Sequence, residues 1–416
     1  MTNRRQLLKF LSVAPLLNPL RTLAQPSGSF AGKFLVTVQA RGAWDTTCFC
    51  DPKENQPGEL PITNWSHSDG TQRAGNIDFA PFADNQRFFT KHAQNMLVIN
   101  GVDAQTNSHS IGETVNWSGR TALGFPTLTA MYAAQFGAHL PMAYVTFGGF
   151  NRTENLLRAT QLGWSVSDIG ELLRPNQHND RPMMDPELWA LITRANATNA
   201  LPDNNTIAGN RSSRQAYRSS IAAIEPLKDF ADTVPAEDQW ESRTRYGFLR
   251  QQVQFTIAAF KSGTAIAADL VQGGFDSHEE NDLYQEIHLR ELSTGIDFLW
   301  DSAEAAGIAD RLVVIIGSDF SRTPYYNSGR GKDHWSVGSF IVMEKGASYT
   351  NRQIAGSDEG QNALAIDPQT LQPSGFGVKM LTSHVHTALR QYMGLEDTNF
   401  SRLYPFRDSV HFRFFG

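Results

Sequence analysis

The sequence predicts an α/β protein, a three-layer αβα sandwich in which helices cover both faces of a mostly parallel β-sheet. Three observations predict this class. Short apolar runs rich in β-branched residues recur along the 416 residues, polar turns containing glycine follow them, and stretches with helical periodicity lie between them. This length is enough for one large α/β domain or two smaller ones.

Six apolar runs are expected to form the strands. They lack a regular alternation of apolar and polar residues, which favours strands buried on both faces. In chain order the predicted strands are KFLVTVQA (33–40), NMLVIN (95–100), AYVTF (143–147), AIAADLV (265–271), RLVVIIG (311–317) and SFIVME (339–344).

Three longer stretches carry apolar residues at three- and four-residue spacing, which predicts amphipathic helices. They are residues 125–137, 242–263 and 284–307. The segment 173–236 differs because it is polar and rich in Asn and Arg. We interpret it as a helical insertion within a single domain of residues 25–416.

In the first 24 residues a charged, an apolar and a small-residue region follow one another in the order typical of an export signal. Arg4 and Arg5 precede an apolar stretch, Leu7 to Leu20, and small residues follow near Ala24. This pattern predicts a twin-arginine leader, hence recognition by the export machinery and a periplasmic or extracellular location. The alternative is an amphipathic first helix. Twin-arginine substrates cross the membrane folded, which suits a protein that acquires a metal in the cytoplasm.

The charge and the cysteine content exclude several classes of protein. Removing residues 1–24 takes away four cations and no acidic residue, so the net charge changes from −6 to −10, which argues against nucleic-acid binding. No apolar run approaches the roughly 20 residues of a transmembrane helix. Cys48 and Cys50 form no disulfide framework, and we interpret them as loop thiols instead of a redox or soft-metal pair.

Polar residues follow four of the predicted strands, and loops at this position bind ligands in open α/β sheets. Carboxylates and imidazoles at one end of a sheet point to Zn²⁺ or another divalent ion, one or two per chain, because a metal offsets the repulsion among the acids. The candidates for metal ligation or catalysis are Asp45, Ser108, His109, Ser110, Asp276, His278, Asp319, Arg322, Asp333 and His334.

Several motifs among these candidates resemble one family. They are RGAWD, SHS, GGFDSH, SDFSRTP and KDHW, preceded by the twin-arginine leader. With them the chain resembles the exported bacterial proteins grouped as domain of unknown function 1501, related to the alkaline phosphatase and sulfatase superfamily. The resemblance covers most of the mature chain and implies an alkaline-phosphatase-like fold.

The resemblance also implies a two-metal site that hydrolyses a small anionic ester. One metal would be held by Asp45 and Asp319, and the other by Asp276, His278 and His334. Ser108 or Ser110 would be the nucleophile and His109 a ligand or base. Arg322 would grip the phosphate or sulfate group, and Asp333 is a further candidate ligand.

The sequence departs from this scheme at three places, one of which is the Asp-x-His spacing of Asp276 and His278, shorter than is usual in the superfamily. Phe320 stands where active phosphatases carry a ligating His after the Asp, and the sulfatase Cys-x-Pro-x-Arg signature is absent. The site of Asp45 and Asp319 could therefore be empty, differently built or lost. Two functions stay open: a metal-dependent hydrolase of phosphate or sulfate esters, or a non-catalytic envelope binding or assembly protein that keeps a metal.

Two further segments near the candidates carry histidines or a glycine-rich turn. SGRGKD (328–333) is expected to be a mobile loop that brings Asp333 and His334 to the site. His384 and His386 are two residues apart on a predicted helix, so they cannot easily share one ion. We expect His384 to lie outside the site, and we do not count His386 among the candidate ligands.

Overall fold

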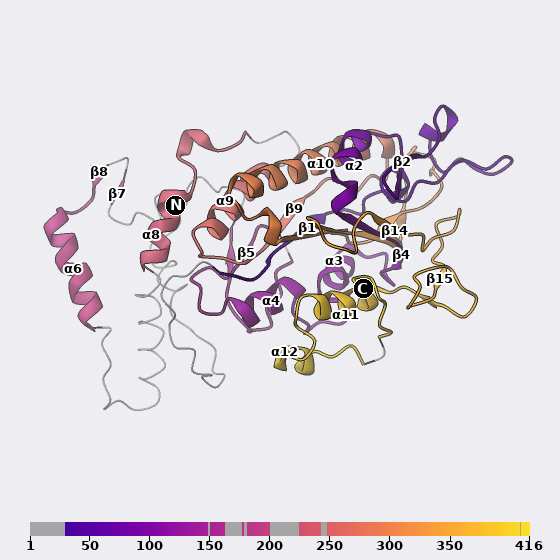
Figure 1. Cartoon of the computed structure of the whole chain (residues 1–416). Helices are drawn as coiled ribbons and strands as arrows, with labels where there is room; N and C mark the ends of the chain where they lie inside the picture. Colours follow the sequence, from indigo (N-terminus) through magenta and orange to yellow (C-terminus); the bar gives the residue numbers. More distant parts are fainter. Residues whose placement is uncertain are drawn as a thin grey trace.

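The computed structural model describes residues 30–148, 150–162, 177–178, 181–199, 224–242, 248–407 and 409–416. Its centre is an eight-stranded sheet in the order β14-β4-β13-β10-β1-β9-β5-β6 (Figure 1). The strands are β1 (Phe34–Ala40), β4 (Met96–Asp103), β5 (Tyr144–Thr146), β6 (Ala159–Gln161), β9 (Ala267–Gln272), β10 (Leu312–Ser318), β13 (Val337–Glu344) and β14 (Arg352–Ile354). All six predicted strands are confirmed.

The sheet is mixed but mostly parallel. β1 pairs in parallel with β10 and β9, β5 with β9 and β6, and β14 with β4. β13 is the exception and runs antiparallel to β10 and β4. The chain between β10 and β13 contains only the short strands β11 (Ser321–Arg322) and β12 (His334–Trp335), and without a crossover helix it returns in the opposite direction.

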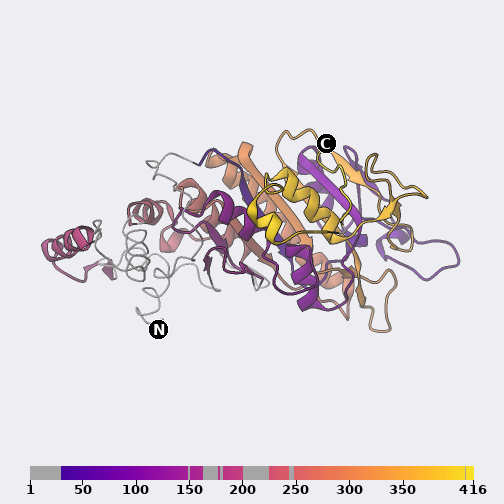
Figure 2. The same ribbon diagram turned by 90° about the horizontal axis from the view of Figure 1, so that it is seen from below.

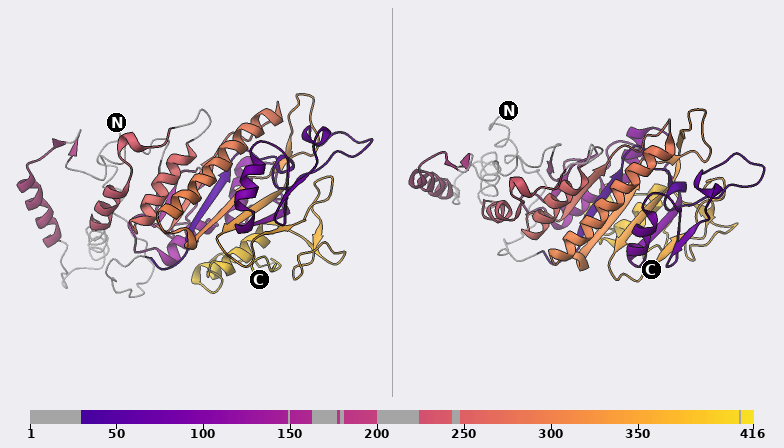
Figure 3. Two further views of the ribbon diagram at one scale, coloured as in Figure 1. Left: turned by 45° about the horizontal axis from the view of Figure 1, so that its top comes forward. Right: turned by 90° about the horizontal axis from the view of Figure 1, so that it is seen from above.

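Helices cover both faces, which confirms the three-layer αβα prediction. One face carries α2 (Asn85–His92), α9 (Leu249–Lys261) and α10 (Asn281–Ala305). The other carries α3 (His109–Ser118), α4 (Leu128–Phe136) and α11 (Thr382–Tyr392). Figure 2 shows α11 and α4 from below, and Figure 3 shows α9, α10 and α2 from above. β1 and β10 are buried along their whole length between these layers.

The predicted helices are confirmed with shifted ends. The helix predicted from residue 125 begins at Leu128, because Thr127 is its N-cap and accepts a hydrogen bond from the Ala130 N–H. The remaining short elements are β2 (Gln72–Ala74), β3 (Ile77–Phe79), β15 (Ala365–Ile366), β16 (Val378–Lys379) and α12 (Asn399–Leu403).

Part of the predicted insertion is described. Within residues 173–236 the structure has β7 (Gln177–His178), β8 (Arg181–Pro182), α6 (Pro186–Asn199) and α8 (Ile224–Thr233). The leader 1–24 lies outside the described residues, so the division of the chain into leader and domain stays a prediction. Among the helices that the structure describes, none has the length and apolar character of a membrane span.

Both cysteines are unpaired and buried. Burial raises the pKa of the Cys48 thiol and of the Cys50 thiol well above the ordinary value. Because the thiolate is the reactive form, buried thiols with raised pKa values are poor redox or metal-binding groups. The structure therefore favours the interpretation of structural thiols.

The histidines of α11, His384 and His386, are both buried. His384 accepts a hydrogen bond from the Leu381 N–H at 3.1 Å, and so caps its own helix. His386 lies 2.8 Å from the Asn116 carbonyl of α3, to which its Nε2–H donates. Neither residue belongs to the strand-end candidates.

The buried His386 makes stability depend on pH. Burial lowers its pKa to about 4 from an ordinary value near 6.5. Between these values the unfolded chain binds the proton more readily, so the stabilisation present above pH 6.5 is lost as the pH falls towards 4. We expect urea unfolding of His386→Gln, which keeps an N–H donor, to depend less on pH over this window. An unchanged pH dependence would contradict this prediction.

Candidate metal centre

The candidate residues come together at one edge of the sheet, which we call the carboxyl edge because β1, β9 and β10 end there. Asp276 and His278 follow β9, and Asp319 follows β10. Because β13 is antiparallel, the residues that precede it, including His334, lie at this same edge. His109 begins α3, which follows β4.

Three imidazoles at the carboxyl edge have the same arrangement of hydrogen bonds. In each ring the Nδ1 atom lies within hydrogen-bonding distance of an acceptor oxygen. Because neither a carboxylate nor a carbonyl can donate, Nδ1 carries the proton. In the neutral ring Nε2 then bears a lone pair. The three contacts are His109 to Asp319 at 2.5 Å, His278 to Asp333 at 3.1 Å and His334 to the Asn107 carbonyl at 2.7 Å.

The free Nε2 atoms converge on the carboxylate of Asp276. Its Oδ1 lies 3.2 Å from the Nε2 of His278, 3.4 Å from that of His109 and 3.7 Å from that of His334. The Nε2 atoms of His278 and His334 are 2.9 Å apart. We call His109, Asp276, His278 and His334 the His–Asp cluster.

The contacts inside the His–Asp cluster suit a divalent cation. Two lone pairs 2.9 Å apart repel each other unless a proton or a cation lies between them. The buried Nε2 of His109 has no hydrogen-bond partner. Tetrahedral ligands about 2.0–2.1 Å from zinc are themselves separated by about 3.3 Å, close to the separations seen here. The candidate ligand atoms of His109, Asp276 and His334 all lie within 4.8 Å of one another.

The surroundings of Asp276 and His334 favour the ionisation states that bind metal. Burial alone raises the pKa of Asp276, but the hydrogen bond and charge of Arg322, with the neighbouring imidazoles, lower it overall. Burial lowers the pKa of His334. An ionised carboxylate and a neutral imidazole are the forms that coordinate a metal.

Asp319 lies behind His109, which differs from the predicted position as a metal ligand. It is fully buried. Its Oδ1 accepts from the amide of Gln39 at 2.9 Å and from the N–H groups of Gly42 and Ala43 at 3.1 and 3.2 Å. Its Oδ2 contacts His109, and this hydrogen bond raises the pKa of the imidazole. Asp319 therefore orients a candidate ligand.

Asp333 has the same relation to His278, and it too was a predicted ligand. The hydrogen bond from His278 lowers the pKa of this carboxyl group. Carboxylates that accept from the second nitrogen of a ligating His fix the ring and its tautomer. The loop 328–333 thus delivers His334 to the cluster and Asp333 to the imidazole of His278.

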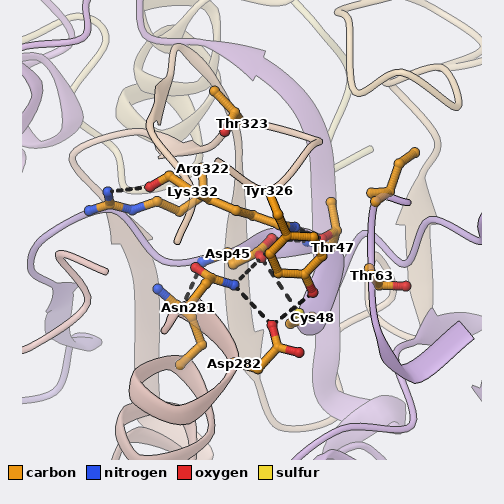
Figure 4. Close-up of polar contacts among 12 residues, drawn as sticks. Asp45, Thr47, Cys48, Thr63, Asn281, Asp282, Arg322, Thr323, Tyr326 and Lys332 are labelled. Atoms are coloured by element: carbon orange, nitrogen blue, oxygen red, sulfur yellow. Dashed lines mark hydrogen bonds and ion pairs between the residues drawn. The ribbon is translucent and has the colours of Figure 1, made fainter. Parts of the chain in front are cut away.

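Asp45 lies outside the His–Asp cluster, which corrects its prediction as a metal ligand. It is fully buried and forms a 2.8 Å ion pair with the equally buried Lys332 (Figure 4). Its oxygens also accept from Thr47 at 2.7 Å and Asn281 at 2.9 Å. The predicted metal pair of Asp45 and Asp319 is therefore not assembled, because one carboxylate pairs with a lysine and the other supports His109.

Arg322 is also placed differently from its prediction as a substrate clamp. Its side chain is fully buried. The guanidinium donates to the Ala43 carbonyl at 2.9 Å, to the Lys332 carbonyl at 3.1 Å, to the Gly42 carbonyl and to Asp276 Oδ1 at 2.7 Å. These contacts leave it no open face toward an anionic substrate.

Phe320 and the two serines complete the surroundings. Phe320 is buried, with its ring centroid 4.9 Å from that of His109 and 4.7 Å from that of His334, and so forms an apolar wall. Ser108 and Ser110 are exposed at the start of α3, with hydroxyl oxygens 3.4 Å apart. Ser108 is the N-cap but makes no side-chain capping bond, so its hydroxyl is not committed to the helix.

Two contributors escaped prediction from the sequence. The Asn107 carbonyl orients His334, but a backbone atom leaves no signal in residue types. Lys332 carries the charge that balances Asp45. Its place directly before the Asp-His pair was a signal, since a cation beside predicted acidic ligands can pair with one of them.

Gly331 permits the close approach of the two loops that carry the candidate ligands His278 and His334. A Cβ atom there would lie 1.9 Å from the His278 carbonyl oxygen, whereas one at Gly329 would meet nothing closer than 3.4 Å. We expect Gly331→Ala to push the loops apart and weaken metal binding, as loss of an orienting partner does, by roughly 10- to 100-fold. Chelator competition measures this, with Gly329→Ala as the matched control. Equal affinities for the two variants would count against this reading.

Comparison with known proteins assigns the family. The model of the DUF1501 family, described as a protein of unknown function, matches residues 33–359. The chain belongs to this family. No curated protein matches the sequence of this DUF1501 member.

Several solved structures are similar to this DUF1501 chain. The crystal structure of Ps i-CgsB with neocarrahexaose has a TM-score of 0.42 and 6% identity, covering 92% of this chain and 75% of that one. BT1596, a 2-O GAG sulfatase, has a TM-score of 0.35 and 10% identity, covering 91% and 73%. A TAB5 alkaline phosphatase mutant with bound Mg has a TM-score of 0.34 and 11% identity, covering 77% and 94%.

Proposed function

We propose that this protein is a metal-dependent hydrolase of phosphate or sulfate esters. The observation that carries the proposal is the convergence of three imidazole lone pairs on the ionised Asp276 at the carboxyl edge. This donor set fits one divalent ion, and Zn²⁺ best, because zinc accepts imidazole and carboxylate ligands in a tetrahedral shell. Bound there, such an ion supplies Lewis-acid chemistry to an ester oxygen.

The start of α3 supplies the remaining chemistry. Ser108 directly precedes the ligand His109, and its exposed hydroxyl makes no capping bond. The first N–H groups of a helix are free to bind an anion, so a phosphate or sulfate group can lie against this end of α3. In the proposed reaction the hydroxyl oxygen of Ser108 or Ser110 attacks the phosphorus or sulfur atom, the bond to the ester oxygen breaks, and the substrate alcohol leaves with the serine proton. Water then hydrolyses the serine ester, releases phosphate or sulfate and restores the hydroxyl, while Asp319 holds the imidazole of His109 in the ligating orientation.

A panel of aryl phosphate monoesters, diesters and aryl sulfates tests this proposal. Zinc-loaded protein is expected to hydrolyse at least one class, and Ser108→Ala or Ser110→Ala to abolish turnover. Ser348→Ala is the matched control, because Ser348 is exposed and follows β13 at the opposite edge of the sheet. Turnover that survives both serine substitutions would exclude the serine mechanism.

A second function is favoured by the contacts of the site. Three imidazoles and one carboxylate can fill a tetrahedral shell, and closed shells are typical of structural metal sites. The donors of Arg322 go to carbonyls and Asp276 instead of a substrate. A non-catalytic envelope binding or assembly protein would bind zinc with the same ligands, yet leave the whole ester panel untouched.

We also propose that residues 1–24 direct export through the twin-arginine pathway. The paired arginines followed by the apolar stretch support this proposal. A cell-fractionation experiment is expected to find the protein in the periplasm or medium, and the variant with Arg4→Lys and Arg5→Lys in the cytoplasm. Export of that double variant by the same route would contradict the proposal.

A further inference from the structure

Arg322 connects three of the segments that form the carboxyl edge. Its Nε donates to Ala43 in the loop after β1, and its Nη1 donates to the carbonyl of Lys332 in the loop before β12. Its Nη2 donates to Asp276 after β9. These segments are far apart in the sequence, yet one buried side chain bonds to all of them.

Lys332 strengthens the same connection. Its backbone N–H donates to the Ser277 carbonyl at 3.1 Å, which lies between Asp276 and His278. Its ammonium group pairs with Asp45 and donates to Thr47 at 3.1 Å. Lys332 also directly precedes Asp333 and His334, so it joins two ligand loops through its backbone. Figure 4 shows Arg322 and Lys332 beside each other.

A buried guanidinium is costly to desolvate, and it gains most where its several donors all find acceptors. The acceptors here belong to the segments whose positions decide whether the ligand atoms converge. Arg322 also contacts one ligand directly, through the 2.7 Å bond to the Oδ1 of Asp276. Ligands held in place before binding lose little conformational entropy when the metal enters.

We propose that Arg322 is a positioning residue for the metal centre, which holds Asp276 and the loop bearing His334 in the binding geometry before the ion arrives. This inference rests on the proposed metal centre but not on hydrolysis. It replaces the predicted contact of Arg322 with substrate by a role in metal affinity. Lysine cannot take over this role, because one ammonium group cannot reach acceptors on three segments in the planar geometry of the guanidinium.

The test is Arg322→Lys, with metal affinity and coordination geometry measured separately. Zinc affinity comes from competition with a chromophoric chelator, and geometry from the absorption bands of the Co²⁺-loaded protein. We expect Arg322→Lys to bind zinc roughly 10- to 100-fold more weakly and to give altered cobalt bands, as outer-shell losses do. Arg390→Lys is the matched control, because Arg390 is buried on α11 and donates to the Tyr404 carbonyl at 2.5 Å.

Each outcome decides the question. Wild-type zinc affinity and cobalt bands in Arg322→Lys would overturn the role of Arg322 while leaving the metal centre standing. If the protein without any substitution binds no zinc, both the metal centre and this inference are overturned. A variant that folds only when zinc is present supports the role, because the ion then does the positioning. A variant that folds in neither condition shows a requirement of the whole fold and overturns the specific role.

Discussion

The variant His278→Ala is expected to bind Zn²⁺ more than about 100-fold more weakly than the unchanged protein. Loss of a partner that only orients a ligand costs roughly 10- to 100-fold, so loss of the ligand costs more. Its Nε2 is 3.2 Å from Asp276 Oδ1 and 2.9 Å from the Nε2 of His334, so it lies beside two of the candidate ligand atoms.

Elemental analysis and thermal unfolding together measure this effect. A ligand present at 100 times its dissociation constant stabilises the folded state by about 2.7 kcal/mol, so zinc should raise the unfolding temperature of the unchanged protein. His278→Ala should lose most of this increase. His67→Ala is the matched control, because His67 is exposed on a short 3-10 helix. If His278→Ala has the same metal content and the same stability as His67→Ala, the proposed metal centre is refuted.

The pH dependence of zinc affinity follows from the same chemistry. Ligating imidazoles must be neutral, so affinity falls as the pH falls and protons compete with the ion. The hydrogen bond to Asp319 raises the pKa of His109 in the metal-free protein. In the competition measurement the loss of affinity on acidification should therefore begin at a higher pH than it would for an isolated histidine.

The variant Lys332→Met is expected to lower the free energy of unfolding of the metal-free protein by about 3–5 kcal/mol. This is the range observed when one partner of a buried ion pair is removed and the other charge stays buried. Asp45 and Lys332 are both fully buried. Burial by itself raises the pKa of Asp45, but the charge and hydrogen bond of Lys332 lower it overall, so the carboxylate is charged at neutral pH.

Urea unfolding in the presence of a chelator measures this effect without the metal. Lys345→Met is the matched control, because Lys345 forms a 2.7 Å ion pair with Glu304 at the exposed surface, where water screens the charges and loss of the pair should change the free energy of unfolding little. The double variant with Asp45→Asn and Lys332→Met should recover part of the loss. Equal small losses in Lys332→Met and in the control would show that the buried pair does not stabilise the fold as argued. The contribution of Asp45 should disappear as the pH falls below about 3.9, its unfolded value.

The strands and their class could be predicted from the sequence, but the direction of one of them could not. The run 339–344 has the same apolar character as the parallel strands, and the structure places it in β13, antiparallel to its neighbours. An apolar run carries no sign of direction. The direction of a strand depends on the segment that connects it to the previous strand. The chain between β10 and β13, which the structure describes throughout, contains no helix, and a parallel return would require a crossover of that kind.

The residue types of the site could also be predicted, but not the part that each residue plays. Asp319 and Asp276 both follow a strand, yet Asp319 orients His109 and Asp276 lies among the candidate ligand atoms. The difference arises from neighbours in space, because the backbone N–H groups near Gly42 engage one oxygen of Asp319 and leave the other for the imidazole.

By itself the sequence determined the α/β class, the six main strands and the clustering of acids and histidines at strand ends. These features depend on the order of apolar and polar residues within short segments. Only the tertiary structure decided that Asp45 pairs with Lys332, that Arg322 is buried against Asp276 and that three imidazoles turn their Nε2 atoms inward. The physical reason is range. Hydrogen bonds and ion pairs act over about 3 Å, and the residues they join here are separated by up to several hundred positions along the chain.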